Sequence, residues 1–501
     1  MSSPWTSLQS RIREVDAIAG ALGVLEWDQQ TYMPSEGGAP RGGHSEVLSR
    51  LQHERWTAPE VGGWLGALPE AGSDEVQQAA VRNARRRYER STRLPARLVG
   101  ELALARAEGF SAWIKAKEAD DFEPFAAPLQ RLIDLVREQA ERLGAAAHPY
   151  DALLEEYDPG ATVAELSPMF ERLASELGIF LNALDGRPEP EGASLPTLDT
   201  EGQKRLSMRI LRDLGFDLKR GRLDESEHPF TCGIHPQDVR LTTHLHAGDL
   251  LNTLGSTVHE CGHGLYEQGL RADWDGTGLN HAAGCGIHES QSRFWENFIG
   301  RSLSFCKYLV PRMQGIWPDL PITAEQLYAA SNRVRRSLIR VSSDEATYNL
   351  HIIVRYELEV ALLEGKLQAR DLPEAWRSAY TRRVGVTPPD LRTGVLQDVH
   401  WSSGYFGYFP SYTVGNLYAA SYAVCVERDI PGLWADVDQG RFGTILEWLR
   451  ERVHSRGHLK DAPELFRDAV GDRDPVEDLV AHLWRRQGKL YGVERPVPAR
   501  A

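Results

Sequence analysis

The sequence predicts an all-α protein that is mainly helical, with one very small β-sheet. Apolar residues recur three or four positions apart through most of the chain, which is the period of an amphipathic helix. The alternating pattern of a strand is clear in only one segment. No internal repeat or long linker divides the 501 residues, of which 42% are hydrophobic. We therefore expect a single helical domain over residues 1–501.

The predicted helices follow one another along the chain. The first covers residues 7–25, whose apolar stripe consists of Leu8, Ile12, Val15, Ile18, Leu22 and Leu25. Residues 79–147 are rich in Ala, Arg, Glu and Leu and predict several long helices, punctuated at Pro95, Pro124 and Pro149. Residues 185–196 combine glycine and proline and predict a loop. Thr200 is expected to cap the next helix.

One segment has the pattern of a strand. Residues 238–246 read Asp-Val-Arg-Leu-Thr-Thr-His-Leu-His, with alternating apolar and polar side chains and several β-branched residues. We expect this segment to belong to the small sheet.

Charge and cysteine content exclude several classes of protein. The chain has 57 Lys and Arg against 71 Asp and Glu, which gives a formal net charge of −14. This acidic balance argues against a protein that binds nucleic acid or an anionic membrane surface. Five scattered cysteines without a C-x-x-C pair predict no disulfide framework and a reducing compartment.

Neither a secretory signal nor a membrane span is expected. The first residues lack an apolar core and reach a charge at Arg11. Residues 401–426 carry no charge, but glycines, Pro410 and five tyrosines interrupt them. We interpret this stretch as buried or lining a cleft, and we expect a cytoplasmic protein.

The strongest functional signal is the sequence His259-Glu260-Cys261-Gly262-His263. Residues four apart lie on one face of a helix, so both imidazoles can bind one Zn²⁺. Glu260 lies beside them, where a carboxylate can take a proton from a metal-bound water. Cys261 is two positions from each histidine, and we expect it to be a small buried residue on the opposite side of the helix.

A catalytic zinc site needs a third protein ligand and an open position. The extended motif with a third histidine is excluded, because Tyr266 and Gly269 stand at the positions that it requires. The third ligand should come from another segment, and residues 288–293 (His-Glu-Ser-Gln-Ser-Arg) are the most obvious source. On spacing alone, the rivals of Glu289 are His281, His288 and Glu296.

These two motifs resemble the carboxypeptidase Taq family, also called thermostable carboxypeptidase 1. Five further motifs agree in order across most of the chain: residues 25–34 (LEWDQQTYMP), 221–230 (GRLDESEHPF), 238–242 (DVRLT), 339–344 (IRVSSD) and 394–401 (GVLQDVHW). One departure is visible, because Ser343 stands where the family usually has alanine.

The resemblance implies a zinc-dependent metallocarboxypeptidase that removes single residues from peptide C-termini with broad side-chain tolerance. It implies a helical fold with a deep central groove, like those of neurolysin and angiotensin-converting enzyme, and commonly a homodimer. Matching positions imply that His259, His263 and Glu289 are the metal ligands and Glu260 the general base. Such a ligand set suits one Zn²⁺ per chain and also accepts Co²⁺.

The tetrahedral intermediate carries an oxyanion, which requires neutral hydrogen-bond donors. His400 and Tyr412 are the candidates, because related helical metallopeptidases use such a pair. Tyr405 and Tyr408 remain open as alternatives, and core packing is the competing role for each of these tyrosines.

A C-terminal carboxylate in a groove calls for a bidentate arginine. The resemblance supports Arg340, with Gln397 as a helper. The competing interpretation is an ion pair between Arg340 and Asp344, four residues apart on a helix. Arg240, with Asp238 nearby, is expected to shape the strand.

Two other functions fit part of the sequence. An oligopeptidase or dipeptidyl carboxypeptidase would keep the same metal site, and the motifs around Arg340 and His400 discriminate against it. A catalytically silent peptide-binding protein would have lost Glu260 or a metal ligand, and none of these residues is lost.

Overall fold

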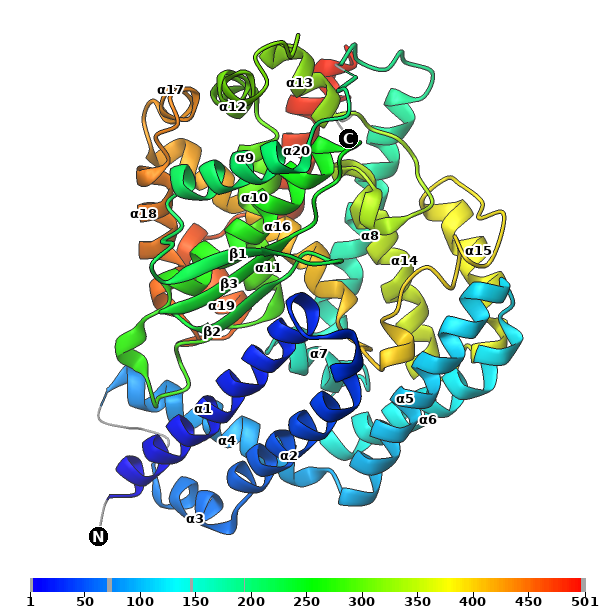
Figure 1. The fold of residues 1–501 in the computed structure, drawn as a ribbon. Coiled ribbons are helices and arrows are strands. Elements are labelled where there is room, and N and C mark those ends of the chain that lie inside the picture. Colours follow the sequence, from blue (N-terminus) through cyan, green and yellow to red (C-terminus); the bar gives the residue numbers. More distant parts are fainter. Residues whose placement is uncertain (1–2, 70–73, 145–146, 193, 497–501) are drawn as a thin grey trace. The chain divides into compact units, whose positions relative to one another are not determined.

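The computed structural model describes residues 3–69, 74–144, 147–192 and 194–496 (Figure 1). The chain divides into two compact units, each assembled from three segments. Unit 1 consists of Met1–Thr92, Gly192–Ser331 and Tyr418–Arg473, and unit 2 of Arg93–Glu191, Asn332–Leu417 and Asp474–Ala501. A single domain over residues 1–501 stays a prediction.

Unit 1 is mainly helical and also holds the three strands. Its helices are α1 (Pro4–Thr31), α2 (Gly38–Trp56), α3 (Pro59–Ala67), α4 (Glu75–Arg93), α9 (Thr200–Leu214), α10 (Leu250–Gly269), α11 (Cys285–Arg293), α12 (Leu303–Ile316), α13 (Ala324–Ser331), α17 (Leu433–Asp438), α18 (Gly443–Arg452) and α19 (Ala462–Val470). The mainly helical class with one small sheet is therefore confirmed, and the first predicted helix is longer at both ends than its stripe indicated.

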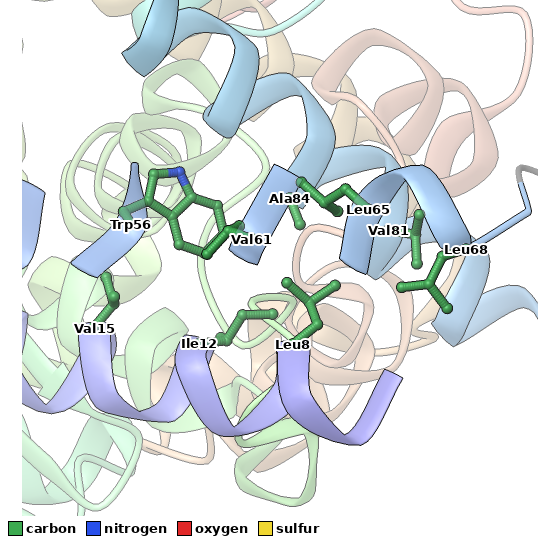
Figure 2. Packing of buried hydrophobic residues seen from close by; sticks show 9 residues of the cluster. All are labelled: Leu8, Ile12, Val15, Trp56, Val61, Leu65, Leu68, Val81 and Ala84. Carbon is green, nitrogen blue, oxygen red and sulfur yellow. The ribbon is translucent and has the colours of Figure 1, made fainter. Parts of the chain in front are cut away.

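The N-terminal half of the apolar stripe of α1 packs against the three helices that follow it (Figure 2). Leu8, Ile12 and Val15 of α1 are at most 3% exposed. Their partners in the cluster are Trp56, Val61, Leu65, Leu68, Val81 and Ala84. Burial of each large aliphatic side chain contributes about 1.5–3 kcal/mol, so the stripe fixes α1 within unit 1.

The small sheet has the strand order β1 (Gly221–Glu225), β3 (Asp238–Thr243), β2 (Thr231–His235). The central β3 runs parallel to β1 and antiparallel to β2, and it packs against α10. The strand predicted over residues 238–246 ends at Thr243, because β1 ends opposite that residue. Beyond it, the backbone N–H of His246 donates to Oγ1 of Thr253 (3.0 Å) and leaves the ladder.

Unit 2 is helical throughout its described elements. Its helices are α5 (Ala96–Ala119), α6 (Glu123–Leu143), α7 (Asp151–Tyr157), α8 (Val163–Leu184), α14 (Glu345–Leu363), α15 (Leu372–Arg383) and α20 (Pro475–Leu483), together with the first half of α16 (Phe409–Asp429). Helix α14 is buried along almost its whole length, although it carries several charged residues.

Helix boundaries follow the expected chemistry with one correction. Pro95 precedes α5 and Pro124 lies in the first turn of α6, where the missing N–H breaks no helical hydrogen bond. The prediction that Thr200 caps α9 is wrong by one residue. Asp199 has an extended backbone and accepts the N–H of Gly202 (2.6 Å), whereas Thr200 is already helical.

The charge-free stretch of residues 401–426 forms a short 3₁₀ turn and most of α16. Leu417 and Tyr422 in it are 0% exposed, which confirms the interpretation as a buried segment. Among the helices of the described residues, none combines the length and apolar character needed to span a membrane.

Candidate metal site and catalytic residues

The motif from His259 to His263 lies in the second half of α10, as the spacing predicted. Asp249 caps this helix, because its carboxylate accepts the N–H of Asn252 (3.1 Å). The rings of His259 and His263 lie one turn apart, with centroids separated by 4.9 Å. Helix α10 packs between the sheet and α11, and both imidazoles are partly buried within unit 1.

Glu289 reaches these imidazoles from α11. Its Oε2 lies 3.4 Å from Nε2 of His263 and 3.7 Å from Nε2 of His259. Gly262 makes this approach possible, since a Cβ there would come within 2.6 Å of the carbonyl oxygen of Gln291. One ligand atom from each of the three residues lies within 4.8 Å of the others. The structure thus brings together the three ligands that the resemblance implied.

Glu289 is held as an anion. Nε of Arg293 donates to its Oε1 (2.5 Å), and the hydroxyl of Ser292 donates to its Oε2 (3.1 Å). Burial alone would raise the pKa of Glu289, but the charges of Arg293 and His259 outweigh burial and hold that pKa well below its usual range.

His263 is held as a neutral imidazole. Burial, followed by the neighbouring His288, lowers the pKa of His263 to about 3. The neutral ring is the form that can donate a nitrogen lone pair to a metal.

Two of the three rival ligands lie outside this group. Glu296, in the π-helical segment Phe294–Gly300 that follows α11, accepts a hydrogen bond from Nδ1 of His259 through its Oε2 (2.9 Å). His281 instead faces Asp16, at 3.8 Å. Glu296 therefore engages the ring nitrogen of His259 that points away from Glu289, an arrangement that fixes a ligand ring in orientation.

His288, the third rival, contacts the ring of His263 and helps to fix its orientation. Its Nδ1 lies 2.5 Å from Nδ1 of His263, and its Nε2 lies 2.8 Å from Oε1 of Glu267. Sequence reasoning missed Glu267, although this residue follows His263 by one helical turn and therefore shares its face of α10.

Glu260 lies on α10 beside this group and is 6% exposed. The hydroxyl of Thr231, in β2, donates to its Oε2 (2.7 Å), so the sheet orients the carboxylate. Burial raises the pKa of Glu260, although His259 opposes the shift. The neighbouring Cys261 is fully buried, as predicted.

Arg340 of unit 2 is 6% exposed and forms a buried ion pair, but not with Asp344. Its Nε and Nη2 both bind Oδ1 of Asp398 (3.0 and 2.9 Å), and its Nη1 donates to the hydroxyl of Tyr348 (3.2 Å). The alternative pairing with Asp344 is wrong, because Asp344 caps α14 and accepts the N–H groups of Ala346 and Thr347.

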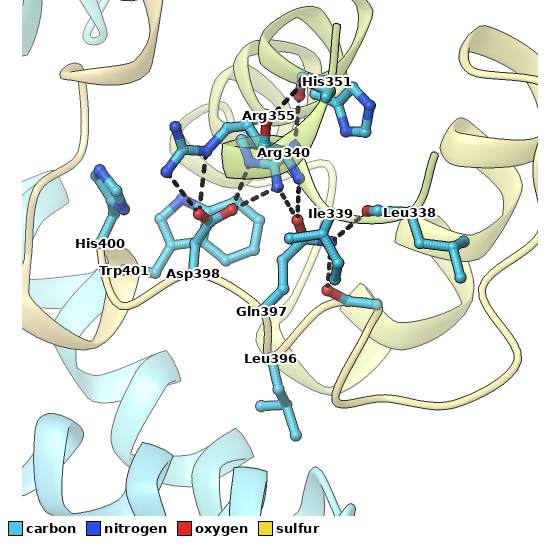
Figure 3. A network of polar contacts seen from close by, with 12 residues as sticks. Leu338, Ile339, Arg340, His351, Arg355, Leu396, Gln397, Asp398, His400 and Trp401 are labelled. Carbon is cyan, nitrogen blue, oxygen red and sulfur yellow. Dashed lines mark hydrogen bonds and ion pairs between the residues drawn. The ribbon is translucent and has the colours of Figure 1, made fainter. Parts of the chain in front are cut away.

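Asp398 bridges two arginines (Figure 3). Its other oxygen, Oδ2, accepts from Nε of the fully buried Arg355 (2.7 Å). Gln397 accepts from the backbone N–H of Arg340 (3.1 Å) and from Nη2 of Arg355 (2.9 Å) through one oxygen, while its amide nitrogen donates to the carbonyl of Leu338 (3.1 Å). Two guanidinium groups thus share one carboxylate, which leaves the cluster with one excess positive charge.

His400 and Tyr412 lie within reach of each other. Nε2 of His400 is 3.4 Å from the hydroxyl of Tyr412, and burial, reinforced by Arg340, lowers the pKa of His400 to about 3. His400 is therefore a neutral imidazole. Tyr408 also lies near, with its ring 5.8 Å from that of His400, whereas Tyr405 is 49% exposed. Both tyrosines remain alternatives to Tyr412.

Arg240 has partners within unit 1. It binds both carboxylate oxygens of Asp238 (3.0 and 2.9 Å) and lies over the ring of Trp27, 4.5 Å from its centroid. This arrangement agrees with the expected role in shaping the strand. His228 is exposed, and its carbonyl accepts from the hydroxyl of Ser226 (2.6 Å).

Comparisons with known proteins agree with this geometry. Residues 7–487 match the family described as carboxypeptidase Taq (M32) metallopeptidase. "Thermostable carboxypeptidase 1" of Thermus thermophilus is 40% identical, covering 96% of this chain and 97% of the relative. "Carboxypeptidase 1" of Bacillus subtilis is 35% identical over 96% and 97% of the two chains.

The fold agrees as well. The crystal structure of M32 carboxypeptidase from Deinococcus radiodurans R1 superposes with a TM-score of 0.95 at 36% identity, covering 98% of this chain and all of the other. The family match spans nearly the whole chain and includes every residue of the metal-ligand group. The chain therefore belongs to the carboxypeptidase Taq (M32) metallopeptidase family.

Proposed function

We propose that this protein is a zinc-dependent carboxypeptidase that releases single amino acids from peptide C-termini with broad side-chain tolerance. One observation carries the proposal: His259, His263 and Glu289 converge on one point, with Glu260 beside them. Each proposed ligand atom comes from a different side chain, and the anionic Glu289 and the neutral His263 are in charge states that suit a divalent cation.

The donor set fits zinc. A tetrahedral Zn²⁺ with bonds of about 2.0–2.1 Å places its ligand atoms about 3.4 Å apart. The separations of 3.4 and 3.7 Å from Glu289 to the two histidines match that requirement. Three protein ligands leave a fourth position for water and substrate, as catalytic zinc sites require. A zinc ion held there supplies a Lewis acid that polarises the scissile carbonyl and lowers the pKa of water towards about 7.

Glu260 acts as the general base. Its raised pKa favours proton transfer, because an effective base has a pKa near the working pH. Thr231 binds Oε2, which orients Oε1 to take the proton of the attacking water. Glu260 then passes that proton to the leaving amine, so the carboxylate is regenerated in each turnover.

His400 and Tyr412 donate hydrogen bonds to the oxyanion of the tetrahedral intermediate. The low pKa of His400 keeps its ring neutral. The ring therefore donates an N–H hydrogen bond to the oxyanion and adds no acidic proton to the transfers that Glu260 carries out. A phenol and a neutral imidazole fixed in place need no reorganisation when the charge develops.

Arg340 binds the C-terminal carboxylate of the peptide. A guanidinium has five N–H donors, and that of Arg340 makes three hydrogen bonds to Asp398 and Tyr348, which leaves two for a bidentate contact. The excess positive charge of the two-arginine cluster favours an anion. The full set of hydrogen bonds around Gln397 supports a role in holding Arg340, alongside the predicted help with the carboxylate.

An oligopeptidase or dipeptidyl carboxypeptidase remains the alternative with the same metal site. A cytoplasmic location and a homodimer are further proposals. None of the five cysteines, all of which lie in the described part of the chain, takes part in a disulfide, which favours a reducing compartment.

The metal site gives the first testable prediction. We expect about one functional metal per chain, loss of activity with a chelator and recovery with Zn²⁺ or Co²⁺. Glu289→Ala should abolish metal binding. Glu296→Ala should keep the metal with an affinity about 10- to 100-fold lower, because it removes only the partner of His259.

The readouts are metal content by mass spectrometry and affinity by chelator competition, which do not depend on activity. Glu267→Gln is the matched control on α10, because it alters a carboxylate that faces His288 and not the ligand group. If Glu296→Ala contained no metal and Glu289→Ala retained it, the third ligand would be Glu296 and not Glu289.

A further inference from the structure

Helix α14 carries a buried polar stripe. His351, Arg355 and Glu359 follow one another at intervals of four residues, and each is 0% exposed. A helix buried on all sides is usually apolar, so these groups need partners. Arg355 and Glu359 both find partners in one segment, residues 397–407, which contains His400.

Glu359 is bound from three directions. Nε1 of Trp401 donates to its Oε1 (2.7 Å), the backbone N–H of Gly407 donates to its Oε2 (2.9 Å), and the hydroxyl of Tyr150 donates to Oε2 as well. Burial raises the pKa of Glu359 to about 7, although these donors and Arg355 oppose the shift. Burial of the Glu359 carboxyl is unfavourable, and its three hydrogen bonds offset that cost. Two of the three donors lie in the same loop.

These contacts bracket His400. On one side, Arg355 binds Asp398, two residues before it. On the other side, Glu359 binds Trp401, the next residue, and Gly407 at the end of the loop. Gly407 has a φ of +90° and lies so near Leu153 that an added Cβ would come within 2.9 Å of it. The loop is thus closed against α14 at both ends of the stretch that leads into α16 and Tyr412.

We propose that Glu359 is a positioning residue for the oxyanion-binding pair of His400 and Tyr412, acting through Trp401 and Gly407. Two of the three hydrogen bonds of Glu359 go to this loop, and we assign its effect on turnover to these two contacts. This inference rests on the proposed function, because it assumes that His400 and Tyr412 serve the transition state.

Three variants separate positioning from general support of the fold. In Glu359→Gln, the amide –NH₂ must face either Nε1–H of Trp401 or the backbone N–H of Gly407. Two hydrogen-bond donors then face each other, and one loop contact is lost. Trp401→Phe removes one loop contact and keeps the carboxylate. Tyr150→Phe removes the third hydrogen bond, whose donor lies outside residues 397–407, and it leaves the contact between Leu153 and Gly407 in place, so it is the matched control.

A displaced oxyanion donor should lower kcat and leave substrate binding intact. Glu359→Gln and Trp401→Phe should each lower kcat about 10- to 100-fold with KM within about twofold, since small misplacements of catalytic groups have costs of this size. Both variants should also lower the binding affinity for a phosphinic peptide, which mimics the tetrahedral intermediate, by the same factor. Their double variant should lose little more than either single variant, because both act on the same contact.

Tyr150→Phe should keep kcat within about threefold even if its melting temperature falls as far as that of Trp401→Phe. Metal content should be unchanged in all variants. A folded Trp401→Phe protein with wild-type kcat, or an equal loss in Tyr150→Phe, would overturn the positioning role. A metal-loaded wild-type protein that releases no C-terminal residues would instead contradict the proposed function itself.

Discussion

Glu260→Gln should retain the metal and lose activity by at least about 10²–10⁴-fold, the range that general base catalysis supplies. The amide has the shape of the carboxylate and can still accept the hydrogen bond from Thr231, so the site keeps its geometry. Only the ability to take a proton from the attacking water is lost. The measurement is kcat/KM on one peptide together with the metal content of the same sample.

Thr231→Val is a graded companion to this variant. It removes the hydroxyl that orients Oε2 of Glu260 but leaves the base, so its loss should be smaller, about tenfold. Near-normal turnover by Glu260→Gln, with metal content confirmed, would contradict the assignment of Glu260 as the base.

Amidation of the peptide C-terminus should lower kcat/KM about 30- to several-thousand-fold. The change removes the charge that Arg340 is proposed to bind, and loss of one partner from a buried charge pair costs about 2–5 kcal/mol. Each 1.36 kcal/mol corresponds to about a tenfold change in rate. Arg340→Ala should cause a similar loss on the free acid and little further loss on the amide, because both changes delete the same interaction.

Four rate measurements, with each enzyme on each peptide, complete this cycle. Arg335→Ala is the matched control, because Arg335 lies nearby in the sequence but is exposed and paired with Glu189. This control should change neither rate more than about twofold. Asp398 keeps its bond to Arg355 in Arg340→Ala, so the network is weakened and not abolished. Additive losses would assign carboxylate recognition to another residue.

The helices could be predicted from the sequence because apolar periodicity and proline positions are signals within each segment. The stripe of α1, Pro95 before α5 and Pro124 in the first turn of α6 indicated helices that the structure confirms. The errors lie at boundaries that depend on partners. Thr200 and Asp199 are both good capping residues, and only the backbone conformation of Asp199 decides between them. The strand ends at Thr243 because β1 ends there, which no alternation within residues 238–246 can reveal.

Only part of the candidate site could be predicted from the sequence. Helical spacing predicted that His259 and His263 share a face, but spacing alone left four residues competing for the third position. The contact that brings Glu289 to these imidazoles is the close approach of α11 to Gly262, which depends on tertiary packing. The competing pairing of Arg340 with Asp344 is wrong because an i, i+4 contact requires one continuous helix. Ser343 is extended and α14 begins only at Glu345, so Asp344 became a cap and Asp398 the partner.

The central claim is that this protein removes residues singly from a free C-terminus at the proposed zinc site. The most direct test is to incubate the metal-loaded protein with one defined peptide, and with its C-terminal amide, and to follow the products by mass spectrometry over time. We expect a ladder of single-residue losses from the free acid, slow conversion of the amide and no products after chelation. Efficient internal cleavage of both peptides, or the release of dipeptides, would contradict this claim.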